Sequence, residues 1–241
     1  MLTPTSAGGI VVHAYDEGHG PTVFLLGPGL DDGTRCKKLA MILTRRFRVL
    51  RLHRRQYRLD LKTDPHLGGS PCAVGDEVQD VLAVVRAVGA PVVLYGHSDG
   101  GVVALEALAA LPAAFAGGVI FEPAAVIGPP LSDDRGRVLT AARAALASGR
   151  PGKAMTIFFR DTIGLPGWQA WLAGLSVALV PKYRRLVPCQ LDSLQALDRL
   201  GVRLGTYATI NVPIVLLGGG SKHNPAHLSA RLDAIQRVVM P

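Results

Sequence analysis

Residues 92–108 read VVLYGHSDGGVVALEAL, and this stretch decides the fold. An apolar β-branched run leads into a Gly-x-Ser-x-Gly turn made by Gly96, Ser98 and Gly100, and a segment rich in Ala, Val and Leu follows. The run predicts a buried strand and the segment predicts a helix. A serine at such a strand-to-helix turn is typical of a nucleophile elbow, in which Oγ is exposed above the sheet. The alternative is a glycine-rich turn whose serine only caps the helix.

The order of the other elements predicts an α/β fold. Residues 10–15 and 22–26 are β-rich runs joined by DEGHGP, and we interpret them as an opening hairpin. Residues 76–88 carry apolar side chains at helical spacing and end at Gly89, a residue type that often terminates helices. Further strands are expected at residues 47–52, 118–121 and 212–217. This alternation indicates a doubly wound, mostly parallel sheet.

The chain changes character between the last two expected strands. Residues 131–205 show helical patterns separated by GRPG, GLPG and VPK breaks. We interpret them as a cap inserted into one domain, whose core consists of residues 1–130 and 206–241. Near the C-terminal end, a helix is expected because four apolar residues share one helical face: Leu228, Leu232, Ile235 and Val239. The alternative is a strand at residues 236–240.

Five pieces of the sequence together resemble a broad family of bacterial α/β-hydrolases. They are the elbow GHSDGG and, along the chain, LLGPGLDDG (25–33), RRFRVL (45–50), GVIFEPA (118–124) and VPIVLLGGGS (212–221). The resemblance spans most of the chain and implies the α/β-hydrolase fold with an inserted helical cap. It also implies a serine hydrolase that cleaves a carboxylic ester, lactone or related acyl bond through an acyl-enzyme, with Ser98 as the nucleophile.

The family presents its catalytic residues in the order Ser, then Asp or Glu, then His. The usual acid position follows the strand at residues 212–217, and here it holds Ser221 or Lys222. We therefore expect the acid to be Glu122, at the end of the preceding strand, a position that the related haloalkane dehalogenases use. The alternative is a structural Glu122 that anchors the cap or a loop.

The catalytic histidine is the component that the sequence does not place. The family carries it on a loop after the last strand, and we expect that strand, its loop and one helix to be missing from the 241 residues. This form of the chain is then expected to be catalytically incompetent by itself. His223 and His227 are the best internal substitutes, and a solvated helix-cap role is the alternative for both. His97 is expected to pack beside the sheet.

Two backbone N–H groups are expected to form an oxyanion hole. One belongs to Asp99, which follows the elbow serine, and its side chain is expected to point elsewhere. The other belongs to Gly29 in the GPG turn, because Pro28 has no N–H to donate, and Leu30 is the fallback. The acidic pair at 31–32 is interpreted as a turn or helix-cap device.

The composition indicates in which cellular compartment we expect the protein and whether we expect it to bind a cofactor. With 241 residues and 49% hydrophobic content, the chain can bury a large core as a single unit. It has no apolar run of membrane-spanning length, and its start, MLTPTSAGG, lacks signal-peptide features, so we expect a cytoplasmic protein without a membrane partner. Three widely spaced cysteines form neither a disulfide framework nor a zinc motif. No residue cluster implies a metal or an organic cofactor.

The formal net charge of +8 raises the question of a nucleic-acid partner. Arginines crowd between positions 45 and 58, but they interleave with apolar residues, and no nucleic-acid-binding motif accompanies them. We therefore expect a solvated, partly salt-bridged rim and no nucleic-acid partner. A homo-oligomer is left open.

Only the cap hints at a substrate. Phe158, Trp168 and Trp171 place aromatic bulk there, which suits a small apolar acyl or ester substrate, and the alternative is that they only hold the cap down. Because fold does not determine function, a second hypothesis is a non-hydrolytic or inactive protein of the same fold: a lyase, a binding protein or a truncated form.

Overall fold

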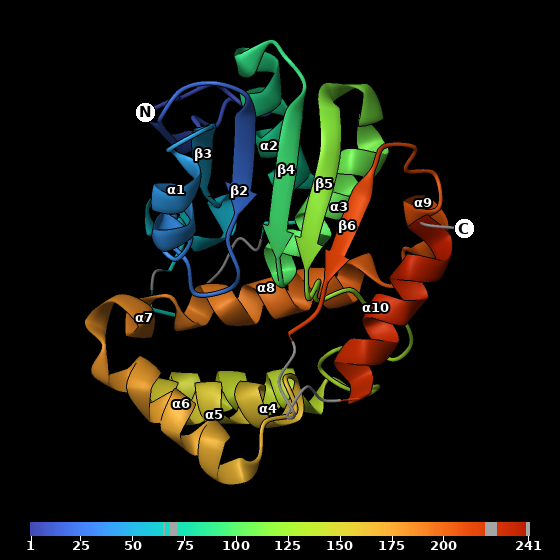
Figure 1. Cartoon of the computed structure of the whole chain (residues 1–241). Helices are drawn as coiled ribbons and strands as arrows, with labels where there is room; N and C mark the ends of the chain where they lie inside the picture. Colours follow the sequence, from blue (N-terminus) through green and yellow to red (C-terminus); the bar gives the residue numbers. More distant parts are fainter. Residues whose placement is uncertain (65, 68–71, 220–225, 240–241) are drawn as a thin grey trace.

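A computed structural model describes residues 1–64, 66–67, 72–219 and 226–239, and it contains a six-stranded sheet between helices (Figure 1). The strand order is β1-β3-β2-β4-β5-β6. β1 runs antiparallel to β3, and every other neighbouring pair is parallel, which confirms the predicted sheet. The strands are β1 (His13–Glu17), β2 (Thr22–Leu26), β3 (Arg48–His53), β4 (Val92–His97), β5 (Phe115–Phe121) and β6 (Ile214–Leu217).

The predicted opening hairpin is wrong, because β3 lies between β1 and β2. Ion pairs accompany the pairing of β1 with β3: Asp16 of β1 pairs with Arg48 of β3 at 2.7 Å, and Glu17 pairs with Arg51 at 3.0 Å. β2 is buried over four of its five residues, so it occupies the interior of the sheet, whereas the polar β1 takes the edge. Both ion pairs join residues that are distant in sequence, which a local turn signal does not reveal.

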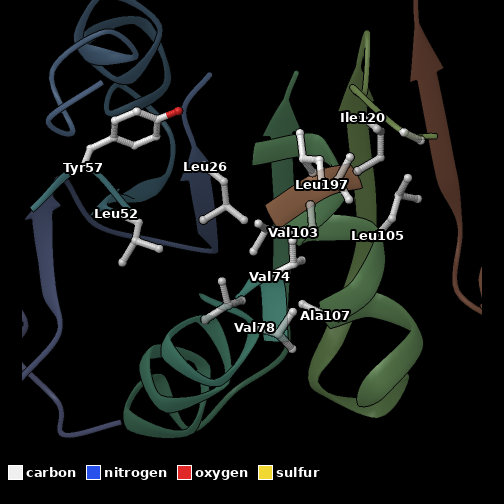
Figure 2. Packing of buried hydrophobic residues seen from close by; sticks show 14 of the residues in the cluster. Leu26, Leu52, Tyr57, Val74, Val78, Val103, Leu105, Ala107, Ile120 and Leu197 are labelled. Atoms are coloured by element: carbon white, nitrogen blue, oxygen red, sulfur yellow. The ribbon is translucent and has the colours of Figure 1, made fainter. Parts of the chain in front are cut away.

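Helices cover both faces of the sheet. α1 (Lys37–Leu43) packs on one face, where its Ala40 joins a small cluster with Val23 and Leu25 of β2. α2 (Val74–Val88) and α3 (Asp99–Ala110) cover the other face, and Figure 2 shows their side chains meeting those of the strands. α2 ends as predicted, because Gly89 adopts the left-handed conformation with φ 71°.

The predicted helical insertion follows β5. In Figure 1 its first three helices lie beyond the carboxyl ends of the parallel strands, and α8 lies between them and the sheet. The insertion comprises α4 (Arg137–Ala147), α5 (Pro151–Asp161), α6 (Gly167–Leu179), α7 (Pro181–Arg185), α8 (Val187–Leu200) and α9 (Leu204–Tyr207), with short 3₁₀ turns η1 (Arg55–Tyr57), η2 (Leu59–Leu61) and η3 (Pro112–Ala114) elsewhere. We refer to these helices, which lie between β5 and β6 in the sequence, as the cap.

The chain after β6 continues into α10 (Ala226–Val239), whose Ile235 is fully buried. The helix expected there is confirmed, and the alternative strand at residues 236–240 is wrong for 236–239, while residue 240 lies outside the described residues. β6 pairs only with β5 in the described sheet, so it forms an edge. No helix in the described ranges is long and apolar enough to cross a membrane. The three cysteines are free and buried.

Candidate active site

Ser98 occupies the sharp turn between β4 and α3. Its φ of 54° and ψ of −122° are a strained conformation for a residue with a side chain. The flanking glycines are needed for this turn: a Cβ on Gly100 would lie 2.3 Å from the carbonyl oxygen of Gly27, and one on Gly96 would lie 2.6 Å from Cβ of Ala104. The turn therefore has the backbone geometry of a nucleophile elbow.

Ser98 opens into a cavity of about 520 Å³ between the sheet and the cap. The ends of the strands contribute Gly29, His97 and Glu122 to the wall, beside Ser98. The cap contributes mostly apolar side chains, among them Phe158, Phe159, Ile163, Leu165 and Val177. Among the described residues, no group of three His, Cys, Asp or Glu side chains could hold a metal ion.

One of the two expected oxyanion donors, Gly29, belongs to the wall of this cavity. The N–H groups of Gly29 and Asp99 have no hydrogen-bond acceptor within the described part of the chain, and Gly29 lines the cavity with Ser98. The role assigned to the acidic pair at 31–32 is confirmed, since Asp31 Oδ1 accepts the N–H groups of Thr34 and Arg35 at 2.8 and 2.9 Å. That carboxylate holds the turn after Gly29 closed.

Glu122 lies at the carboxyl end of β5, with φ 43°, and it borders the same cavity as Ser98. Its Oε1 accepts the N–H of Gly219, on the loop after β6, at 2.7 Å. Its own N–H donates to the carbonyl oxygen of Leu217 at 3.0 Å. The structure thus brings Glu122 to the nucleophile's side of the sheet and also gives it a loop-anchoring contact.

None of the histidine side chains in the described ranges forms a hydrogen bond with Ser98. Ser98 Oγ forms no hydrogen bond within the described residues. His97 packs on Phe121, with ring centroids 4.7 Å apart, and burial lowers its pKa. His223 lies outside the described residues, and of His227, in the first turn of α10, only the backbone is described.

The expected aromatic lining needs a correction. Phe158 is buried and lines the cavity. Trp168 and Trp171 do not: they are 65% and 57% exposed, and they lie on α6, whose opposite side contributes Ser176 and Val177 to the cavity. Helical periodicity turns the two tryptophans outward, and the sequence did not show which face of α6 the cavity would take.

A buried polar network behind the turn escaped the sequence analysis. The Asp99 carboxylate accepts the Tyr57 hydroxyl at 2.7 Å and the Ser193 hydroxyl of α8 at 2.9 Å, and it pairs with Arg54 at 2.9 Å. Arg54 also binds Glu77 of α2 at 2.7 Å and donates to the carbonyl oxygen of Gly27. The network joins the elbow, the loop after β2 and α8.

The expectation of a solvated arginine rim is therefore wrong in part. The salt bridges are confirmed, because Arg48, Arg51, Arg54, Arg55 and Arg58 each pair with a carboxylate. The solvation is not, because the side chains of Arg51, Arg54 and Arg58 are buried. Spacing along a strand does not identify the acidic partners that make burial of a guanidinium tolerable.

Replacing Arg54 by methionine is expected to lower the free energy of unfolding by about 3–5 kcal/mol, because it leaves the carboxylates of Glu77 and Asp99 buried without their cation. Denaturant titration would measure the change. The matched control is Arg48→Met, whose ion pair with Asp16 is partly exposed and should cost about 1 kcal/mol or less. Equal losses in the two variants would contradict a central role for the Arg54 network.

Comparisons with known proteins agree with this geometry. A family model described as "Alpha/beta hydrolase family" matches residues 3–241. Solved structures that resemble the chain include an alpha/beta hydrolase from Sphaerobacter thermophilus DSM 20745, with TM-score 0.77, 24% identity and coverage of 99% of this chain and 89% of that one. No curated protein matches the sequence.

Two further neighbours carry names that describe a reaction. A thermophilic esterase from Thermogutta terrifontis has TM-score 0.66 and 20% identity, with coverage of 99% of this chain and 86% of that one. An enol-lactonase from Burkholderia xenovorans LB400 has TM-score 0.68 and 18% identity, with coverage of 98% and 87%. At these identities the likeness shows the fold alone.

Proposed function

The chain belongs to the alpha/beta hydrolase family and is a hydrolase, and on this premise we propose that it is a serine hydrolase that cleaves a carboxylic ester, lactone or related acyl bond through an acyl-enzyme. The observation that carries the proposal is Ser98, held at φ 54° at the end of β4 and open to an apolar cavity. The neighbours named as an esterase and an enol-lactonase support acyl-bond cleavage.

In the proposed reaction, Ser98 Oγ attacks the acyl carbon while a base takes its proton. The N–H groups of Gly29 and Asp99 donate to the oxyanion of the tetrahedral intermediate. The intermediate collapses to the acyl-enzyme and releases the alcohol, which receives the proton from the base. Water, deprotonated by the same base, then hydrolyses the acyl-enzyme and regenerates Ser98.

Glu122 is proposed as the acid that orients the base and stabilises its protonated form. Its carboxylate borders the cavity and lies against Gly219 of the loop that follows β6. Within this chain, His223 and His227 are the candidates for the base, because they follow β6, whose carboxyl end lies at the same rim of the sheet as Ser98. A base at either position would make the 241 residues active, in place of the incompetence expected when the base lies on a further loop. The apolar lining of the cavity supports an acyl group with an apolar body.

A fluorophosphonate probe should label Ser98, since such probes react with serines that an adjacent base activates. Peptide mass spectrometry would locate the adduct. The matched control is Ser176→Ala, which removes another serine of the same cavity whose Oγ donates to the carbonyl oxygen of Leu172, so labelling should be unchanged. An adduct that persists in Ser98→Ala, or its absence from the wild-type protein, would count against the proposal.

A further inference from the structure

Two guanidinium groups line the otherwise largely apolar cavity. Arg35 follows the oxyanion loop, and Arg231 projects from α10. Neither arginine forms an ion pair with a carboxylate within the described residues. The residues outside the described ranges contain no Asp or Glu side chain.

The nearby carboxylates are already engaged. Glu122, which lines the cavity, accepts the N–H of Gly219. Asp161, which borders an adjoining groove together with Arg231, pairs with Arg160 at 2.6 Å. Two cations therefore face the cavity against one carboxylate.

Arg231 is the more constrained of the two cations. It is partly buried, and burial lowers its pKa, with no neighbouring anion to offset the loss of hydration. Arg35 is exposed, and its guanidinium makes a long contact of 3.4 Å with the carbonyl oxygen of Gly29 and lies 5.9 Å from the centre of the Tyr183 ring. An unpaired guanidinium facing an apolar cavity is a ready site for a carboxylate, to which it can donate two parallel hydrogen bonds.

We infer that the substrate carries a carboxylate in addition to the acyl bond that is cleaved, and that Arg231 binds this carboxylate while Arg35 adds positive potential at the cavity. The inference rests on the proposed function. It specifies the substrate as an acid ester, a lactone acid or a related anionic acyl compound with an apolar body. A neutral ester of the same shape leaves Arg231 unpaired and is bound less well.

Two matched esters test this substrate class: mono-4-nitrophenyl glutarate, which ends in a carboxylate, and 4-nitrophenyl pentanoate, which ends in a methyl group. Arg231→Gln should lower kcat/KM for the glutarate ester by about tenfold to a hundredfold, mainly through KM, and leave the pentanoate ester within about twofold. Arg231→Lys should restore part of the preference. The control is Arg237→Gln on the same helix, which removes an exposed charge that does not line the cavity.

A binding measurement separates this inference from the proposed function. Glutarate should bind the Ser98→Ala protein in calorimetry, and binding should weaken by at least about tenfold in Ser98→Ala/Arg231→Gln. Arg231-dependent glutarate binding without hydrolysis of either ester would support the proposed anion site and refute the proposed serine-hydrolase activity. Hydrolysis of both esters with equal kcat/KM, together with no glutarate binding, would refute the proposed anion site and support the proposed serine-hydrolase activity.

Discussion

Replacing Ser98 by alanine is expected to lower kcat/KM for an aryl ester by about three to six orders of magnitude, because it removes the proposed nucleophile. The residual rate would come from substrate binding and the oxyanion donors, which the substitution leaves in place. Stopped-flow or steady-state assay of 4-nitrophenol release would measure the loss. The acyl-enzyme burst, if the wild-type protein shows one, should vanish with it.

Two controls make this result specific to Ser98. Ser176→Ala removes a hydroxyl from the same cavity and should keep kcat/KM within about twofold, because that hydroxyl is bonded to the backbone of its own helix. Circular dichroism of Ser98→Ala should match the wild type, since the glycines that permit the turn are unchanged. A Ser98→Ala protein that keeps its activity within tenfold would refute the nucleophile assignment.

Replacing Glu122 by glutamine is expected to lower kcat by about two to four orders of magnitude while the fold is retained. Glutamine keeps an oxygen that can accept the Gly219 N–H, now 2.7 Å from Glu122 Oε1, so the loop stays anchored. It removes the negative charge that would orient the base and stabilise its protonated form. Steady-state kinetics and thermal unfolding on the same preparations would separate the two roles.

The control for this variant is Glu106→Gln on α3, the same chemical change at a residue that pairs with Arg203 and does not line the cavity. It should change kcat by less than about twofold. If Glu122→Gln keeps both kcat and the unfolding temperature, Glu122 only anchors the loop, which is the alternative that the sequence left open. A loss of stability without a loss of kcat would lead to the same conclusion.

Sequence patterns correctly predicted those elements that depend mainly on residues close together in the sequence. The elbow is one: a Cβ on Gly96 would lie 2.6 Å from Cβ of Ala104, in the helix that packs onto the same strand, although the 2.3 Å contact at Gly100 is with the more distant Gly27. The end of α2 is another, because Gly89 takes the left-handed conformation that stops a helix. The C-terminal helix also followed from periodicity alone. The roles of Ser98, Gly29 and Asp99 in catalysis stay predictions.

The sequence-based predictions were wrong where the structure depends on contacts between residues that are distant in the sequence. β1 pairs with β3 instead of β2, and the ion pairs of Asp16 and Glu17 with the arginines of β3 join residues that are distant in sequence. Trp168 and Trp171 face outward because the other side of α6 packs toward the cavity. The position of Arg231 in the cavity depends on where α10 packs, which its own sequence does not specify.

By itself, the sequence determined the strand, turn and helix around Ser98, because the β-branched run, the Gly-x-Ser-x-Gly turn and the helix-forming run are contiguous. Tertiary structure alone decided that Arg54, fully buried, would join Glu77 to Asp99 behind the turn, and that Arg231 would face the cavity without a carboxylate. The physical reason is that steric limits on φ and ψ act within a few residues. The burial and pairing of a charge, in contrast, depend on every element that packs around it.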